Sequence, residues 1–226
     1  MADAITDEVQ SRREQRRQRH QSLSRSQLLD AAEEVFGRKG FHETTLKEIA
    51  ELAEFSVGSV YSFFENKDDL FQQIFVRRGE EFMPLLREAA RDEGSPIEQL
   101  HRLIDFEIGW FRANRHFGRL YLRNSSATML SSDREVDEVI AANYDESMRL
   151  QAALMQRGQQ AGQIREGDPE VLARLFSGMI SAYQALDPGV IADDPSVREI
   201  EAFPLSQLHD IIDAAFVVPA PRRAAR

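Results

Sequence analysis

Apolar residues recur at helical spacing along almost the whole chain, and this pattern constrains the fold more than any other feature. Between residues 22 and 39, the side chains of Leu28, Ala32, Val35 and Phe36 fall on one face of a helix. Similar stripes recur in later segments, and no run shows the sustained polar–apolar alternation of a strand. We therefore predict an all-α fold.

Helix boundary signals divide this pattern into segments. Thr45 and Glu48 form a capping-box sequence, Ser95 precedes a proline, and Gly40 occupies the position after a helix end. Residues 187–203 are predicted to form a loop. The helices are expected at about 22–39, 45–53, 56–63, 67–92, 96–113, 116–129, 133–161, 168–186 and 204–218.

Composition excludes several classes of protein. The chain has no cysteine, no apolar run of the roughly 20 residues that cross a bilayer, and no signal-peptide core at its N-terminus. We therefore expect a cytoplasmic protein without a membrane segment. The five histidines lie far apart, and His101 and Asp105 are interpreted as a surface pair rather than as metal ligands. We predict no catalytic site, metal or cofactor, and hence no enzyme.

Charge is distributed unevenly around a net value of −10. Five arginines lie within residues 12–19, whereas residues 22–78 hold seven Lys or Arg against ten Asp or Glu. Residues 1–21 are predicted to be a basic disordered arm, which either contacts phosphates or remains a solvated tail. Residues 219–226 are predicted to be a disordered tail.

Residues 44–64 have the spacing of a helix-turn-helix, in which the second helix enters the DNA major groove. Gly58 costs roughly 1 kcal/mol of helix stability relative to alanine, which indicates a need for close approach. The spacing alone also fits a helical hairpin packed in a core. The residues expected to approach the bases are small or polar: Ser56, Val57, Gly58 and Ser59.

The same segment resembles the DNA-binding domain of TetR-type (tetracycline-repressor-like) transcriptional regulators. The matching motifs are LLDAAEEVFGRKGF, TTLKEIAELA and SVGSVYSFFENKDDL. The resemblance implies phosphate contacts by Thr45, Lys47, Tyr61 and Lys67, and contacts to base edges by Ser56, Val57, Gly58 and Ser59. It also implies that Phe64 belongs to the core of the domain.

The sequence departs from the family pattern at three positions. Glu54 stands in the turn where the family usually has glycine, so this residue must take or avoid a left-handed conformation at some cost. Ser62 and Phe63 stand where the family often has an aromatic residue and a histidine. The usual DNA contacts of those two residues are therefore not carried over.

The resemblance further implies that residues 22–78 form a three-helix DNA-binding domain and residues 79–218 a helical ligand-binding and dimerisation domain. Aromatic and methionine side chains in the second domain favour a mainly apolar small ligand, although each also fits an ordinary bundle core. Arg112, Arg115, Arg119 and Arg123 form one stripe if their helix is continuous, either as a solvated face or as a site for an anionic group. The candidate ligand-binding residues are Phe106, Trp110, Tyr121, Met148, Phe176 and Tyr183.

We therefore predict a sequence-specific transcriptional regulator, a homodimeric repressor that a small-molecule effector releases from a double-stranded DNA operator. Two recognition helices about one DNA turn apart read a palindrome, which requires a dimer. The apolar faces of residues 168–186 and 204–218 match in position the family's dimer helices. The alternative is a helical small-molecule or protein-binding module without operator binding.

Overall fold

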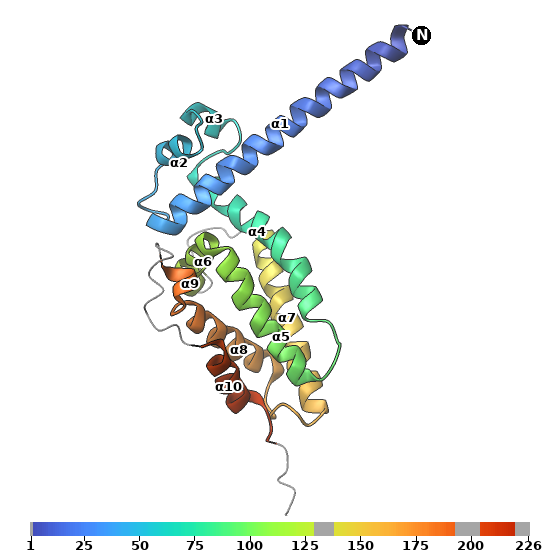
Figure 1. Cartoon of the computed structure of the whole chain (residues 1–226), viewed down its shortest axis with the longest axis vertical. Coiled ribbons are helices and arrows are strands. Elements are labelled where there is room, and N and C mark those ends of the chain that lie inside the picture. The colour runs from blue at the N-terminus through green and yellow to red at the C-terminus, as the bar shows by residue number, and fades with distance from the viewer. Residues whose placement is uncertain (1, 129–137, 193–203, 220–226) are drawn as a thin grey trace, which may run out of the picture. The chain divides into compact units, whose positions relative to one another are not determined.

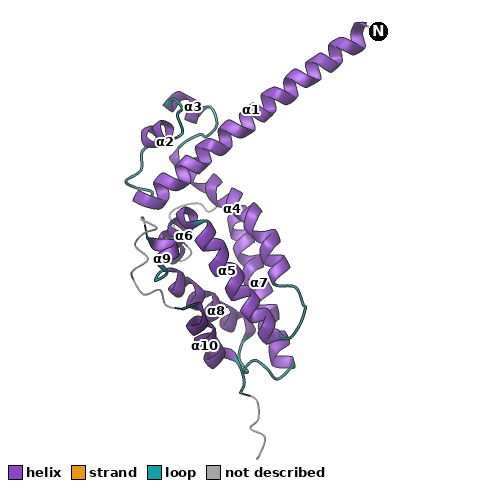
Figure 2. Ribbon diagram, in the orientation of Figure 1, coloured by secondary structure: helices purple, strands orange, loops and turns teal. Residues whose placement is uncertain are grey.

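The computed structural model describes residues 2–128, 138–192 and 204–219, with side chains from residue 12 to 123 and throughout the two later ranges. Every regular element in these ranges is a helix, as the predicted all-α fold requires (Figure 2). The chain divides into two compact units, Met1–Ile74 and Phe75–Arg226. None of the described helices is both long enough and apolar enough to cross a membrane.

The first unit contains α1 (Ala2–Lys39), α2 (Leu46–Leu52), α3 (Val57–Tyr61) and the beginning of α4 (Lys67–Ala89) (Figure 1). Residues 2–21, which the sequence predicts to be a disordered arm, continue α1 toward the N-terminus in the structure. No glycine or proline interrupts residues 2–36, and the segment is rich in arginine, glutamine and glutamate, which are good helix formers.

The core of the first unit forms around the predicted apolar face of α1. Leu28 and Phe36 are fully buried, and Ile49, Val60 and Leu70 cover them from the other helices. The ring of Phe36 also packs edge-on against Phe71, with 5.4 Å between ring centroids. Phe64 is buried as expected. These contacts fix α2 and α3 against α1.

The second unit contains the rest of α4 together with α5 (Pro96–Ala113), α6 (Arg115–Thr128), α7 (Glu138–Gln160), α8 (Pro169–Gln184), α9 (Pro188–Ile191) and α10 (Leu205–Phe216). The predicted loop at 187–203 begins instead with α9, because Asp187 caps the amide of Gly189 and Pro188 takes the first helical position. The predicted helical start at 133–137, the rest of that loop at 193–203 and the tail from residue 220 lie outside the described residues.

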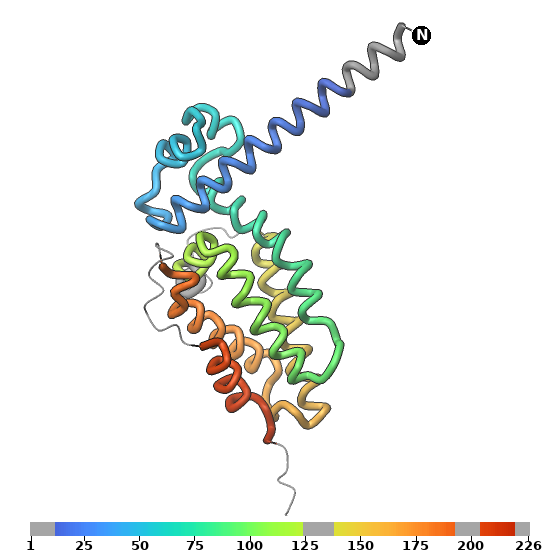
Figure 3. The backbone as a smooth tube through the Cα atoms, viewed as in Figure 1, coloured from blue at the N-terminus to red at the C-terminus, as the bar shows by residue number. Residues whose placement is uncertain are grey.

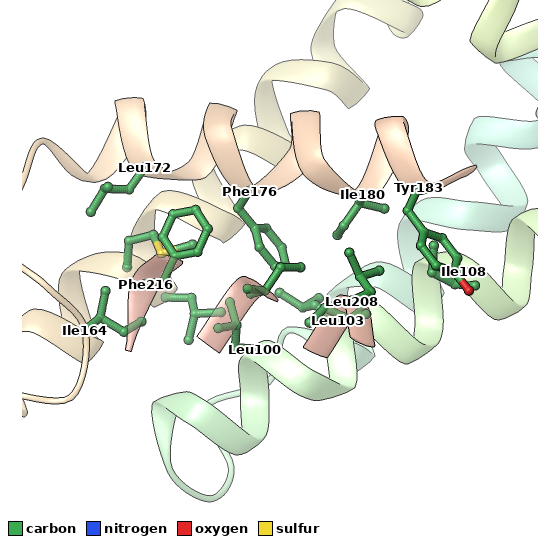
Figure 4. Close-up of a cluster of buried hydrophobic side chains, with 14 of the residues drawn as sticks. Leu100, Leu103, Ile108, Ile164, Leu172, Phe176, Ile180, Tyr183, Leu208 and Phe216 are labelled. Carbon is green, nitrogen blue, oxygen red and sulfur yellow. The ribbon is translucent and has the colours of Figure 1, made fainter. Parts of the chain in front are cut away.

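The apolar core of the second unit lies between α5, α8 and α10. In Figure 4, Phe176 and Ile180 of α8 point toward Leu100 and Leu103 of α5, with Leu208 of α10 beside them. All five side chains are almost completely buried. A paired hydrogen bond from Arg87 to Glu146, at 2.6 and 2.7 Å, also ties α4 to α7. The helices around this core supply the walls of the cavity described below.

Candidate nucleic-acid interface and effector cavity

The start of α2 is fixed by the predicted capping box. The Thr45 hydroxyl accepts a hydrogen bond from the Glu48 amide at 3.3 Å, and Glu48 Oε2 accepts one from the Thr45 amide at 3.0 Å. Lys39 also donates to Glu48. Lys39 and the two Thr45 hydrogen bonds together lower the pKa of the Glu48 carboxyl to about 2. The capping carboxylate therefore stays ionised at neutral pH.

The turn between α2 and α3 places Glu54 in the left-handed region, at a φ of 59°. The Phe55 amide donates to the Ala50 carbonyl at 2.8 Å, and the Glu54 amide donates to the Glu51 carbonyl at 3.2 Å. This pair of hydrogen bonds is a Schellman motif, which requires a left-handed residue at the Glu54 position. The departure from glycine is therefore accommodated by strain and not by a different turn. Figure 3 shows the course of the backbone through residues 46–61 as a tube.

The short helix α3 presents its first residues outward. Ser56 is the N-cap, and its hydroxyl accepts a hydrogen bond from the Ser59 amide at 3.1 Å. Val60 is fully buried and anchors the helix, whereas Val57 and Tyr61 are 36% and 57% exposed. One face of α3 is therefore packed against the domain, and the face that carries the residues predicted to contact base edges is left exposed.

Packing inside the protein does not account for Gly58. A Cβ atom added at this position would meet only the Ser56 hydroxyl, at an ordinary contact distance of 3.7 Å. Glycine nevertheless weakens a helix by roughly 1 kcal/mol relative to alanine. The missing side chain therefore keeps the outer face of α3 open to a close approach.

The two lysines expected to contact phosphate lie in different settings. Lys47 is exposed and makes only a loose 3.7 Å ion pair with Glu51. Lys67 donates to the carbonyls of Phe41 at 2.9 Å and Thr44 at 3.0 Å, and its ammonium lies 4.3 Å from the centroid of the Phe41 ring. Two of its three donors thus hold the connection between α1 and α2.

A cavity of about 110 Å³ lies in the second unit, between helices α4, α5, α6, α7 and α8. Its aromatic walls include Phe82, Trp110 and Phe117, and the Trp110 ring lies 4.8 Å from that of Phe82 and 5.6 Å from that of Phe117. Glycine at residue 79 allows the walls to meet, since a Cβ there would lie 2.3 Å from the Asn143 amide. Polar side chains on the walls are Arg78, Glu107, Asn143, Ser147, Gln151, Ser177, Ser181 and Gln184.

Two acidic groups on the cavity wall have raised pKa values. Burial raises the pKa of the Glu107 carboxyl to about 8. Burial, and then the neighbouring Glu107 charge, raise the pKa of the Tyr121 hydroxyl to about 12. Gln151 Nε2 donates to Glu107 Oε1 at 3.3 Å. Near neutral pH both acids are therefore mainly protonated in the empty cavity.

Comparison with known sequences assigns both units of the chain. Residues 28–74 match bacterial regulatory proteins of the tetR family, and residues 93–184 match the tetracyclin repressor-like C-terminal domain. The chain belongs to the tetR family. It is thus a DNA-binding transcriptional regulator, and the resemblance seen in its sequence is confirmed.

The similarity to relatives and solved structures covers most of this regulator. The fatty acid metabolism regulator protein of Bacillus subtilis is 25% identical over 66% of this chain and 74% of its own length. The regulator UidR of Escherichia coli K12 is 27% identical over 75% of this chain and 81% of its own length. A Saccharomonospora viridis regulator in complex with choline has a TM-score of 0.69 at 18% identity, covering 88% of this chain and 100% of that one.

Three of the six candidate ligand-binding residues lie on the cavity wall of the regulator: Trp110, Tyr121 and Met148. The other three are not among its lining residues. Phe176 is fully buried in the core, and Phe106 stacks on Phe82 beside that core. Tyr183 is buried as well, and its hydroxyl accepts a hydrogen bond from Arg112 at 3.1 Å. Spacing along a helix did not distinguish core residues from cavity-lining residues, because residues of both kinds belong to the same apolar stripe.

The polar lining of the cavity was missed at the sequence level, although one residue carried a signal. Glu107 stands at an inward position of α5, following Leu103 and Ile104 by one helical turn. A carboxylate in the middle of an apolar stripe is unusual unless it has a partner or a function. Gln151 and Gln184 are also buried, but no motif marks either of them.

The arginine stripe of the sequence is broken in the structure. Asn114 ends α5, and Arg115 starts α6. Arg112 instead donates to Asp187 at 2.6 Å, and the adjacent Arg119 is buried. No continuous cationic face is therefore available for an anionic ligand at this point.

Two histidines of the regulator link α5 to α10. His101 Nε2 lies 2.8 Å from an oxygen of Asp213, and His209 Nε2 lies 2.8 Å from an oxygen of Asp105. His101 and Asp105 thus each bind a residue of the other helix. In the described ranges no cluster of three or more His, Cys, Asp or Glu side chains could hold a metal ion.

Proposed function

We propose that this regulator is a homodimeric repressor that binds a palindromic operator and releases it when a small ligand enters the cavity. The observation that carries the proposal is the outer face of α3, which is anchored by Val60 and leaves Val57, Gly58 and Tyr61 open. Such a face suits insertion into a major groove. We assign no catalytic step to the protein.

The assignment of DNA contacts follows the geometry of the first unit. Ser56, Val57, Gly58 and Ser59 are proposed to face base edges, because they occupy the N-terminal turn of α3. A separate set is proposed to bind phosphates, namely Thr45, Lys47, Tyr61 and the remaining donor of Lys67. Contacts of the second kind strengthen binding to all sequences alike.

Dimer formation is proposed through α8 and α10. Val171 and Leu175 on α8 and Ile211 on α10 are each about half exposed, although the opposite sides of these helices are buried in the core. Burying these side chains against a second copy removes apolar area from water. Sedimentation at micromolar concentration is expected to show a dimer, and a stable monomer would contradict the proposal.

Induction is proposed to act through α4. This helix begins with Lys67 in the first unit and contributes Phe75, Arg78 and Phe82 to the cavity in the second. A ligand releases DNA only if it binds more tightly to a state with wrongly spaced recognition helices. Pro84 lies inside α4 and removes one backbone hydrogen bond, so we propose that α4 bends there.

The chemistry of the ligand does not follow from the fold. Solved structures with this fold include one regulator in complex with choline and the Bacillus subtilis FadR in complex with stearoyl-CoA. We propose that the cavity of this chain takes a small, mainly apolar molecule, because aromatic and aliphatic side chains together form most of its wall.

A mobility-shift assay with the DNA that flanks the protein's own gene tests the proposal. Sequence-specific retention that a small molecule reverses is the expected result. Trp110 is the only tryptophan of the chain and lies on the cavity wall, so the same molecule should change its fluorescence over the same concentration range. Failure to retain any DNA specifically would instead favour a binding module without operator activity.

A further inference from the structure

Glu107 is a buried acidic residue on the cavity wall. The side chain is 8% exposed and lies on the wall, and the hydrogen bond that it receives among the described residues is a long one, 3.3 Å from Gln151 Nε2. No described cation forms an ion pair with it. A buried carboxylate without a partner is costly, so its presence in this cavity requires an explanation.

Aromatic rings line the same cavity as Glu107. Phe82, Trp110, Phe117 and Tyr121 share the cavity wall with it, and the Phe82, Trp110 and Phe117 rings contact one another edge to face. Ring faces attract cations, and desolvation strengthens this attraction. A carboxylate inside an aromatic wall is therefore suited to a positive group that also carries apolar substituents.

The remaining polar groups of the wall do not supply that positive charge. Arg78 donates to Glu81 at 2.5 Å, so its positive charge is paired with a carboxylate of the same helix. Gln151 and Gln184 are each 1% exposed, and Gln151 Oε1 and Gln184 Nε2 have no hydrogen-bond partner. Buried amides are normally satisfied, and the Gln151 oxygen, on the side chain that contacts Glu107, is an acceptor that an ammonium N–H can fill.

We propose that the effector is a small organic ammonium ion, whose charge pairs with Glu107 and whose apolar groups pack on the aromatic wall. This inference rests on the proposed function of the cavity as the effector site. An anionic ligand would bind more weakly as Glu107 loses its proton, so its affinity should fall with rising pH, which is the opposite of the dependence expected for a cation.

Binding of a cation is coupled to loss of the Glu107 proton. Burial raises the pKa of Glu107 to about 8, so at neutral pH the empty cavity holds the acid form, and an incoming cation favours the carboxylate. One proton therefore leaves for solvent as one cation binds. Affinity should rise with pH up to about 8 and then level off. The titratable or charged groups that face Glu107 are Arg78 on α4, Tyr121 on α6 and Tyr144 on α7.

Three probes of one shape and different charge test the proposal: phenyltrimethylammonium, the neutral tert-butylbenzene and the anionic benzenesulfonate. Each is titrated into the full chain at about pH 6.5 and about pH 8.5, on either side of the Glu107 transition, with Trp110 emission as the signal. We expect the ammonium ion to bind at least about tenfold more tightly than the neutral probe at the higher pH. Benzenesulfonate should bind more weakly at the higher pH than at the lower one.

Glu107→Gln keeps the shape of the side chain and its ability to accept from Gln151. This variant should bind the ammonium ion about tenfold more weakly, without pH dependence, and the neutral probe as before. Asp105→Asn is the matched control, since it removes an exposed carboxylate from the same helix and should change neither affinity. Calorimetry of the unaltered protein in two buffers of different ionisation enthalpy should show proton release on binding at about pH 7.

Equal affinity for the ammonium and neutral probes, tighter binding of the sulfonate, or no binding of any probe would overturn the proposal. So would the absence of proton release, a measurement that does not depend on any variant. Operator binding by the ligand-free protein is measured separately in the mobility-shift assay. A failed probe experiment with intact operator binding thus rejects the ammonium effector alone, whereas lost operator binding rejects the proposed function.

Discussion

The reading head (Thr45–Tyr61) and the effector cavity differ in how their residues are brought together. The reading head is built from consecutive residues, and each is positioned by a neighbour within one or two helical turns, as in the Thr45–Glu48 cap and the Glu54 turn. The cavity draws on five helices between residues 75 and 184. Local chemistry therefore determines the first region, whereas the second depends on how long helices pack.

Filling the cavity is expected to produce the largest effect, because it should remove the response to the inducer without changing DNA binding. Met148→Trp places a larger side chain against the wall and should abolish release by an inducer while leaving operator affinity unchanged. The reading head does not need an open cavity to bind DNA. Mobility shifts with and without inducer measure both quantities, and an unchanged inducer response would place the effector site elsewhere.

Replacing Lys67 should lower the stability of the first unit. Lys67→Ala leaves the carbonyls of Phe41 and Thr44 without their donor, which should cost roughly 2–3 kcal/mol of unfolding free energy. Lys47→Ala is the control, because that side chain is exposed. It should leave stability unchanged and reduce the salt slope of DNA binding by about one. Chemical denaturation and salt titration separate the two roles, and equal stability of both variants would refute the role assigned to Lys67.

Gly58→Ala should change stability and DNA affinity in opposite directions. The added methyl group meets only the Ser56 hydroxyl, at an ordinary contact distance, and favours the helix by about 1 kcal/mol. It also stands between α3 and the bases, so operator affinity should fall by about tenfold or more. Gly109→Ala, at another helical glycine with open space, should gain stability without this loss. An operator affinity that survives Gly58→Ala would show that α3 does not approach DNA as proposed.

Relieving the strained turn is expected to have the smallest effect. Glu54→Gly removes the steric cost of a φ of 59° and should stabilise the first unit by about 1 kcal/mol. Operator affinity and induction should stay the same, because the Schellman hydrogen bonds already fix the turn. Thermal unfolding measures the gain, and a loss of stability would mean that the Glu54 side chain makes a compensating contact.

Local signals in the sequence were enough to predict the helical class, most helix boundaries and the helix-turn-helix at residues 44–64. These features depend on interactions between close neighbours: the caps at Thr45 and Ser95, the glycine at residue 40 and the spacing of apolar side chains. Residues 2–21 were interpreted as a disordered arm from their high charge, whereas in the structure they continue α1, and the segment is rich in Arg, Gln and Glu, which favour a helix.

Only the tertiary structure decided which apolar side chains are core and which line the cavity. Phe176 and Trp110 look alike in a helical pattern, yet one is sealed between α5 and α10 and the other faces an opening among five helices. Lys67 likewise donates to the carbonyls of Phe41 and Thr44, which lie more than twenty residues earlier in the sequence. Such contacts depend on how helices that are distant in the sequence pack together. The spacing of residues along the chain therefore does not predict them.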